Sequence, residues 1–347
     1  MIYLCGWMAL YWGLFASHWR GRPPQMVAVL AILFIAFIAV LRGNVGTDTE
    51  SYEYWAGAVR DGAGLVGAEP GFTGLLYILT SGIESNQMVI RAIALIYALL
   101  VLQAYRQGDR DERFVLLSFF LPAFFFIHSM NVVRLGMAAA LLLTAAMHAR
   151  DQRQGKFKFF AALAVIFHYT SALPVLILWA TTPGRSDKRG VVPAVLILLS
   201  IFAYLWFNLD WIDQKSVAYS ELQTPDELSG LSQIAIVLAL LAAIASSGLP
   251  VMARLKLTGL GAALAIGGWV LARQSYAGLR LLDLLSLSLP LAFLINLGTL
   301  GIALNRRAKV CLLLAGLLSV AAQYRGFLAN ESVGASPFLP YTSLLSE

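Results

Sequence analysis

Long apolar runs separated by short polar segments recur from one end of the chain to the other. We place these runs at about residues 2–17, 25–41, 87–105, 114–128, 131–148, 157–182, 191–207, 231–248, 257–272, 280–298 and 310–323. Most of them are roughly long enough to cross a ~30 Å hydrocarbon core as a helix. The period-2 alternation typical of a transmembrane β-barrel is absent from them. The pattern therefore predicts an all-α, polytopic integral membrane protein.

Polar residues interrupt two of the longest apolar regions and predict pairs of short helices near residues 114–182. HSMNVVR divides the first region, so we expect helices at 114–128 and 131–148 with a sharp turn between them. FHYTS interrupts the second region near His168, which could be one span or two short helices, and we prefer two because the charge bias described below requires two crossings here. With these pairs, we expect about 12 transmembrane helices, within a range of about 10 to 14. A GT-C-like arrangement is compatible with this pattern.

Two further stretches depart from a simple series of spans. Phe72–Gly82 is apolar but too short to cross a bilayer, and we expect it to be re-entrant or to lie at the interface. The tail from Tyr324 is polar, and we expect it to be loose and without a fold of its own.

Composition and charge support the membrane assignment and orient the chain. Hydrophobic residues make up 59% and charged residues 13%, whereas soluble proteins carry about a quarter charged residues. The loops 18–24, 106–113, 149–158, 183–190, 249–256 and 299–309 hold about two thirds of the 25 Lys and Arg but about a quarter of the 19 Asp and Glu. This bias predicts that these loops are cytoplasmic and that both termini lie outside. We therefore attribute the net charge of +6 to topology and not to a nucleic-acid partner.

The same topology predicts one transmembrane domain over residues 1–347. A polar loop at 42–86 and a second loop at 208–230 would lie on the outer face. Cys5 and Cys311 would lie near opposite faces and could not pair.

Several arginines oppose the positive-inside bias because they lie at or near outer helix ends. They are Arg42, Arg91, Arg134, Arg273 and Arg280. Placing an Arg side chain at membrane depth costs roughly 2.5–3.5 kcal/mol of free energy unless the side chain is paired or hydrated. Guanidinium groups bind phosphate bidentately, so this set indicates a phosphate or diphosphate site, with Arg134 as its clearest member. Alternatively, each Arg snorkels to the interface or pairs with a carboxylate such as Asp48, Glu84 or Asp283.

Carboxylates cluster in the first long polar stretch, which follows the second apolar run. Asp48 could act as a base or accept a sugar hydroxyl, or it could cap a helix through Tyr52–Val59. Glu69 in EPGF is either a turn carboxylate or a site residue. The aromatic residues at 51–55 fit an interfacial belt, with sugar-stacking platforms as the alternative.

His168 falls at an outer turn and could be either a structural residue or a base. No H-E-x-x-H, paired CxxC, Walker loop or GxSxG motif occurs in the sequence. We therefore expect no metal and no cofactor.

Four motifs in order give the chain a family resemblance. RGNVGTDTESY, EPGF, NVVRLGMAAALLL and FHYTSALPVLIL resemble the motifs of EpsG-like, Wzy-type exopolysaccharide (O-antigen) polymerases. The matching positions are Arg42, Gly46, Thr47, Asp48, Tyr52, Glu69, Gly71, Asn131, Arg134, His168, Ser171 and Arg280. One departure is Leu135, since Gln or Lys often follows the motif Arg in that family.

The resemblance implies a metal-independent glycosyltransferase that joins undecaprenyl-diphosphate-linked oligosaccharide repeats. The reaction would take place on the outer, periplasmic face of the bacterial cytoplasmic (inner) membrane. On this interpretation Asp48, His168 and Arg134 are catalytic, with Asp48 or His168 as the base. The diphosphate would be bound by Arg134, Arg280, Arg42 and Arg273, and sugar hydroxyls by Tyr52, Glu69 and Asn131.

The resemblance also implies partners and leaves alternatives. The lipid bilayer, a flippase and a chain-length regulator (copolymerase) are the partners expected for such a polymerase. An O-antigen-ligase-type transferase would show the same spans and outer residues. A lipid-linked glycan transporter or flippase would instead need charges near the bilayer midplane and inverted repeats.

Overall fold

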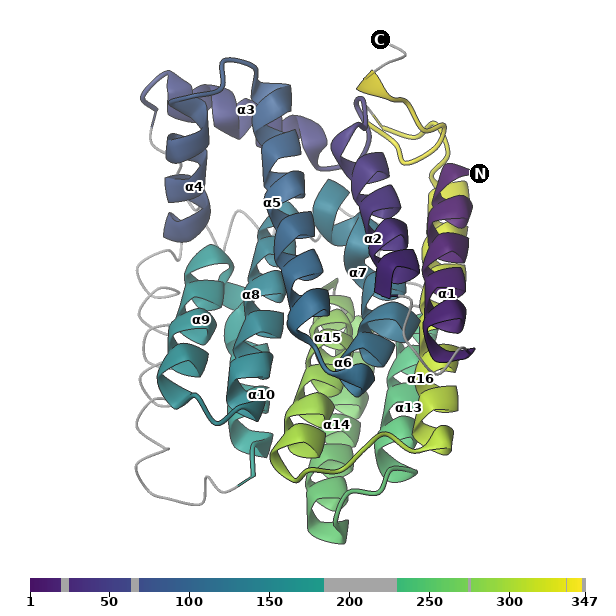
Figure 1. Cartoon of the computed structure of the whole chain (residues 1–347). Coiled ribbons are helices and arrows are strands. Elements are labelled where there is room, and N and C mark those ends of the chain that lie inside the picture. Colours follow the sequence, from purple (N-terminus) through teal and green to yellow (C-terminus); the bar gives the residue numbers. More distant parts are fainter. Residues whose placement is uncertain (20–24, 64–68, 184–229, 274–275, 335, 345–347) are drawn as a thin grey trace. The chain divides into compact units, whose positions relative to one another are not determined.

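The computed structural model describes residues 1–347 except 20–24, 64–68, 184–229, 274–275, 335 and 345–347 (Figure 1). The apolar run expected at 191–207 and the outer loop expected at 208–230, apart from Gly230, lie outside the described residues.

Within these described ranges the regular elements are helices, apart from one isolated β-bridge. The helices are α1 (Ile2–Trp19), α2 (Gln25–Val40), α3 (Thr49–Arg60), α4 (Pro70–Thr80), α5 (Asn86–Gln107), α6 (Arg110–Val115), η1 (Leu116–Phe120), α7 (Leu121–Met130), α8 (Val133–Arg150), α9 (Gln154–Phe167), η2 (Tyr169–Ser171), α10 (Ala172–Thr181), α13 (Leu231–Ala245), α14 (Val251–Ala272), α15 (Tyr276–Thr299) and α16 (Arg306–Ala329). The all-α prediction is confirmed for this part of the chain.

Five of the described helical segments are long and apolar enough to cross a membrane. They are α5, the continuous run α6–η1–α7, α14, α15 and α16. The helices α1, α2, α4 and α13 and the segment Tyr169–Thr181 are also apolar but shorter. The expected total of about 12 crossings stays a prediction.

Both predicted pairs of short helices are present. Helix α7 ends at Met130 and α8 begins at Val133, so only a two-residue turn separates them. A Cβ at Gly136 would lie 2.2 Å from the His128 carbonyl oxygen, so the missing side chain permits this close approach. Helix α9 ends at Phe167, directly before His168, and α10 follows after η2.

The described residues form two compact units. The first unit contains Met1–Leu141, Ile166–His168 and Ser319–Glu347, and the second contains Leu142–Val165 and Tyr169–Leu318. In the first unit α2 packs against α1, α5 and α7, while α3 and α4 both pack on α5 (Figure 1). In the second unit α15 packs against α10, α13 and α14.

Each unit has a buried apolar core, and some of its polar groups form hydrogen bonds between helices. In the first unit the Trp7 indole donates to the Pro122 carbonyl oxygen at 3.1 Å. In the second unit buried Asn296 donates to the Thr181 carbonyl oxygen at 3.0 Å. Such bonds are needed because an unpaired polar group is costly away from water.

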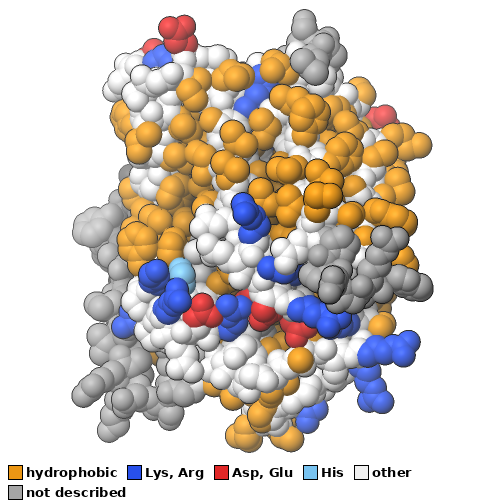
Figure 2. Space-filling view, in the orientation of Figure 1, with side chains coloured by type: hydrophobic (Ala, Val, Ile, Leu, Met, Phe, Trp, Pro, Cys, Tyr) orange, Lys and Arg blue, Asp and Glu red, His pale blue; other side chains and the backbone are white. Residues whose placement is uncertain are grey.

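One face of the first unit is covered by exposed apolar side chains. They include Trp12, Phe15, Met26, Leu30, Phe37 and Leu99 on α1, α2 and α5. Figure 2 shows this apolar surface. A large exposed apolar face on a helical bundle is typical of a lipid-facing surface.

The expectation of a loose tail from Tyr324 is wrong. Helix α16 continues to Ala329, and residues 332–334 and 336–344, which we call the C-terminal strap, pack onto the rest of the first unit. Phe338 of the strap stacks on Phe327 with ring centroids 4.2 Å apart. Burial of Phe338 and Leu339 fixes the strap, although its other residues are mainly polar or small.

The loop of residues 41–48 links α2 to α3 and lies against the α7–α8 turn. Gly46 has φ +106°, and a Cβ there would lie 2.1 Å from the Met130 carbonyl oxygen. Both its backbone conformation and its surroundings therefore require glycine.

Replacing Gly46 tests this packing, with Gly62 as a matched control. Gly62 also has positive φ, +76°, but a Cβ there would meet nothing within 4 Å. We expect Gly62→Ala to lower the free energy of unfolding by about 1–2 kcal/mol through backbone strain alone. Gly46→Ala should lower it by the same amount through strain and by about 1–3 kcal/mol more through overpacking. Thermal unfolding in detergent measures both, and equal midpoints for the two variants would contradict the packing described for Gly46.

Candidate functional site

Glu69 begins α4 and keeps its side chain available for contacts outside that helix. Pro70 suits the first helical position, because its missing N–H would have no partner there. The Glu69 carbonyl oxygen accepts from the Thr73 backbone N–H at 3.0 Å and from its hydroxyl at 3.1 Å. The Glu69 carboxylate makes no cap hydrogen bond to α4.

Gly71 brings this end of α4 against the end of α9. A Cβ at Gly71 would lie 3.0 Å from the side chain and carbonyl oxygen of Ile166 and from the ring of Phe167. A larger residue would therefore push the two segments apart. The close approach places Glu69 beside His168, the residue that follows α9.

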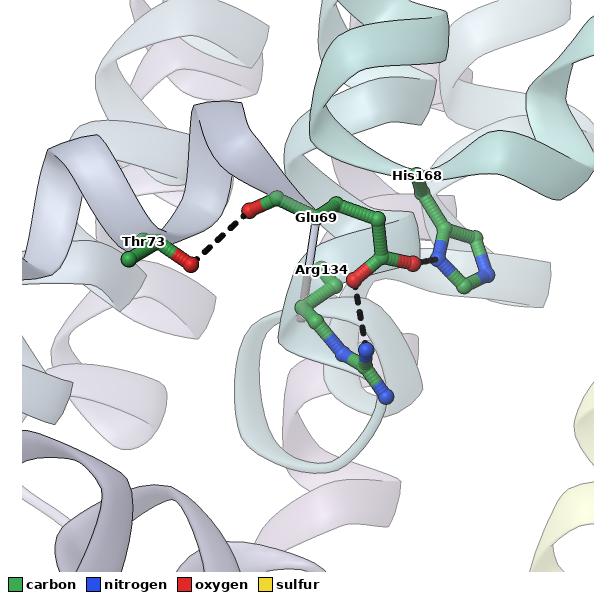
Figure 3. Close-up of polar contacts among 4 residues, drawn as sticks. All are labelled: Glu69, Thr73, Arg134 and His168. Atoms are coloured by element: carbon green, nitrogen blue, oxygen red, sulfur yellow. Dashed lines mark hydrogen bonds and ion pairs between the residues drawn. The ribbon is translucent and has the colours of Figure 1, made fainter. Parts of the chain in front are cut away.

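The Glu69 carboxylate bridges Arg134 and His168 (Figure 3). Its Oε2 lies 2.5 Å from Nη1 of Arg134, and its Oε1 lies 2.6 Å from Nδ1 of His168. The Glu69 side chain is only 5% exposed, whereas those of Arg134 and His168 are 21% and 20% exposed. Three motifs that are far apart in the sequence thus meet at one carboxylate, and both of its partners are more exposed than the carboxylate itself.

These partners keep Glu69 ionised. Burial by itself raises the pKa of the Glu69 carboxyl, but the hydrogen bond from His168 and the charge of Arg134 outweigh burial. The net result is a pKa below the usual value for a glutamate.

The ionised carboxylate also determines which nitrogen of His168 can act as a base. A carboxylate only accepts hydrogen bonds, so Nδ1 of His168 must carry the proton. The lone pair of the neutral ring is then on Nε2. Nε2 makes no hydrogen bond to any residue in the described part of the chain. This arrangement leaves a positioned basic nitrogen beside a guanidinium group.

Aromatic residues of α3 form one side of the site. The Arg134 guanidinium lies over the Trp55 ring, 4.7 Å from its centroid, and interacts with the Tyr52 hydroxyl. Tyr52, Trp55 and Phe72 contact one another at centroid distances of 5.6 to 6.2 Å. Burial raises the pKa of Tyr52 more than the charge of Arg134 lowers it, so its hydroxyl stays neutral.

Asn131 fixes the loop that carries Asp48. Its Oδ1 accepts from the Thr47 hydroxyl at 2.8 Å and from the Asp48 backbone N–H at 2.9 Å. Asp48 occupies the N-cap position of α3, but its side chain makes no cap hydrogen bond. Asp48 is therefore the N-cap residue by position, as one alternative predicted, but without a capping hydrogen bond from its side chain. The Asp48 charge acts on Tyr52, which places the carboxylate near the aromatic side of the site.

Arg42 is 1% exposed and points into the first unit. Its Nη1 donates to the Ser129 carbonyl oxygen at 2.7 Å. Arg91 in turn donates from Nε and Nη2 to the Arg42 carbonyl oxygen at 2.9 and 2.7 Å. These contacts connect the ends of α2 and α7 to α5, and diphosphate binding by Arg42 stays a prediction.

The remaining predicted arginines belong to the second unit. Arg273 lies over the Trp269 ring at 4.0 Å from its centroid, and Arg280 is exposed on α15. Both stay predictions as diphosphate ligands. Thus Tyr52, Glu69, Arg134 and His168 meet in the first unit, with Asp48 on the adjoining loop 41–48 and Asn131 in the α7–α8 turn.

Two features of this site were not predicted from the sequence. The first is the contact between Trp55 and Arg134: the aromatic residues at 51–55 were interpreted mainly as an interfacial belt, although the spacing of three residues places Tyr52 and Trp55 on one face of α3. Glu69 was expected to bind sugar, and its position between Arg134 and His168 was not foreseen. Among the residues that the structure describes, no three His, Cys, Asp or Glu side chains are grouped as metal ligands. The groups of this cluster that can carry positive charge are the Arg134 guanidinium and the His168 ring.

Comparison with known proteins gives one match. The model of the EpsG family matches residues 26–343, a range that includes the loop 41–48, Glu69, Arg134, His168 and nearly all of the C-terminal strap. No curated protein and no solved structure matches the chain. Because the family model covers most of the sequence, this chain belongs to the EpsG family.

Proposed function

We propose that the chain is a polysaccharide polymerase that joins lipid-linked oligosaccharide repeats by glycosyl transfer. Membership of the EpsG family supports a membrane protein of the polysaccharide polymerase type. The observation that carries the proposal is the Glu69 carboxylate shared between Arg134 and His168. This group combines a cation for a leaving anion with a base for an acceptor hydroxyl.

The donor is a glycan attached through its anomeric carbon to undecaprenyl diphosphate. Its diphosphate is already a good leaving group, so it needs charge stabilisation more than a proton. A guanidinium has five N–H donors, and Glu69 occupies the Nη1 side of Arg134. The partly exposed group can therefore hold Glu69 and the diphosphate together. Arg273 and Arg280 are proposed as further diphosphate ligands.

The acceptor is a hydroxyl group of an incoming repeat, and His168 Nε2 removes its proton. The hydroxyl oxygen forms a bond to the anomeric carbon as the bond from that carbon to the diphosphate oxygen breaks. The diphosphate leaves with the electron pair, and the proton passes to Nε2. Glu69 then stabilises the imidazolium through Nδ1, as a carboxylate partner does for a catalytic histidine. Asp48 is the alternative base, whereas His168 has the hydrogen bond from Nδ1 to Glu69 that orients its ring.

Sugar rings occupy the space beside α3. The Tyr52 hydroxyl and the Asp48 carboxylate supply polar contacts, and the partly exposed Trp55 ring offers an apolar surface. Asn131 acts by fixing the Thr47–Asp48 backbone. We propose that the site faces the outside of the bacterial cytoplasmic membrane, on the side that the positive-inside bias assigns to these residues. A flippase and a chain-length regulator are proposed partners.

Removing the Arg134 guanidinium tests the donor half of the site. We expect Arg134→Ala to lower the rate of polymer formation by about 100-fold or more, because a preorganised charge at the leaving group is lost. Arg134→Lys should recover only part of the rate, since an ammonium cannot form the planar bidentate contact. The measurement is polymer formed from lipid-linked repeats by purified protein.

Arg60→Ala is the matched control for Arg134. Arg60 donates to Asn86 and to the Ile83 carbonyl oxygen, and neither contact involves a residue of the Glu69 cluster. We expect near wild-type polymer from this variant. Unchanged polymer from Arg134→Ala at equal protein level would reject the role of Arg134.

Removing the His168 base tests the acceptor half. We expect His168→Gln to lower the rate by about 100-fold or more, within the range for a general base. His148→Gln is the control, because His148 stacks on Phe160 in the second unit and has no role in the proposed chemistry. If both variants keep the wild-type rate, His168 is not the base, and Asp48→Asn becomes the decisive variant.

Glycan pattern in a deletion strain separates the polymerase from the two rival functions. Loss of a polymerase leaves single repeats attached to their final acceptor. Loss of a ligase leaves no repeat attached, and loss of a flippase keeps lipid-linked repeats on the cytoplasmic side. Single attached repeats are the expected result, and either other pattern would overturn the proposed function.

A further inference from the structure

The C-terminal strap bonds to the loop that carries Asp48, although almost the whole chain separates them in sequence. At one end of the loop, Gly43 N–H donates to the Thr342 carbonyl oxygen and Leu344 N–H donates to the Leu41 carbonyl oxygen, each at 2.9 Å. Arg42 and Ser343 form an isolated antiparallel bridge between these two bonds. The strap thus pairs with the loop backbone as a very short β-ladder.

Ser336 adds a contact at the other end of the loop. Its hydroxyl donates to the Gly46 carbonyl oxygen at 2.7 Å across a separation of 290 residues, and its side chain is buried. The same carbonyl oxygen accepts from the Thr49 backbone N–H at 2.8 Å, at the first residue of α3. Ser336 therefore bonds to the turn from which α3 starts, and α3 carries Tyr52 and Trp55.

The opposite side of the loop is held by groups of the site. Asn131 Oδ1 accepts from Thr47 and Asp48, and the Met130 carbonyl oxygen lies against Gly46. The loop is thus held between the α7–α8 turn and the strap. Loss of the contacts on either side would loosen the backbone of Thr47 and Asp48.

The strap has its own anchors, which do not involve this turn. Phe338 stacks on Phe327 of α16, and the Tyr3 hydroxyl of α1 donates to the Phe338 carbonyl oxygen at 3.1 Å. The Tyr341 hydroxyl donates to the Ile38 carbonyl oxygen in α2 at 2.9 Å. These contacts hold the strap on α1, α2 and α16 separately from its bond to Gly46.

We propose that Ser336 is a positioning residue for the transfer site. Through Gly46 it fixes the Thr47–Asp48 backbone and the start of α3, and so the placement of Asp48 and Tyr52 against the incoming sugar. The part of this proposal that concerns sugar rests on the proposed function. The part that concerns order in the loop does not.

The test compares Ser336→Ala with Tyr341→Phe. Each variant removes one strap hydroxyl that donates to a backbone carbonyl oxygen, but the first bond ends on the site loop and the second on α2. Hydrogen exchange is followed in a peptide covering residues 43–49, and polymer formation is followed over a range of lipid-linked repeat concentrations. Thermal midpoints report any general loss of stability.

We expect Ser336→Ala to speed exchange in residues 43–49 by about 5-fold, the change for one lost net hydrogen bond of about 1 kcal/mol. The same variant should raise the KM for lipid-linked repeat. Tyr341→Phe should lower the thermal midpoint as much as Ser336→Ala but leave loop exchange and KM unchanged.

Three results would overturn the proposal. They are unchanged exchange in Ser336→Ala, equal loosening of the loop in both variants, and a loosened loop with unchanged KM. A wild-type protein that forms no polymer would instead reject the proposed function. In that case the exchange comparison alone decides whether Ser336 orders the loop.

Discussion

The ionised Glu69 carboxylate is the constraint on which the rest of the candidate site depends. It is almost fully buried, and an ionised carboxylate away from water needs charged or hydrogen-bonding partners. Arg134 and His168 meet this need, one at each oxygen. The partners are in turn oriented by the carboxylate: Arg134 is held over Trp55, and His168 is held in the tautomer with a basic Nε2. One interaction thus organises the groups that the proposed chemistry needs at both the donor and the acceptor.

Local features of the backbone make this meeting possible. Pro70 starts α4 directly after Glu69, and Gly71 lets that end of α4 lie against the end of α9. Gly136 allows α8 to turn back closely on α7, so Arg134 lies near the turn. Gly46 allows the Asp48 loop to lie against Met130, where Asn131 and the C-terminal strap hold it. The glycines of the motifs therefore act by permitting close approach, and the polar residues act at the sites so formed.

Much of this could be predicted from sequence because helix ends are encoded locally. Apolar runs and their polar interruptions placed the α7–α8 turn and the break at His168, and the positive-inside bias placed Glu69, Arg134 and His168 on one side. What could not be predicted is which side chains pair. Charge alone does not distinguish Asp48 from Glu69 as the partner of Arg134, because the choice depends on the packing of α4 against α9. Arg42 resembled an anion ligand by position, yet its side chain turns inward to Ser129. The strap was not predicted because its tail is mainly polar. The buried apolar side chains that fix it are Phe338 and Leu339, and two such residues give no recognisable apolar run.

Glu69 acts on the reaction in part through His168, and a double-mutant cycle tests this most directly. Rates of polymer formation by purified protein are compared for the wild type, Glu69→Gln, His168→Gln and the double variant. Coupling between the two residues predicts strongly non-additive losses, so the double variant should be much faster than the product of the two single losses implies. Losses that multiply in the double variant would show that the two residues act independently and would contradict a role of Glu69 through His168.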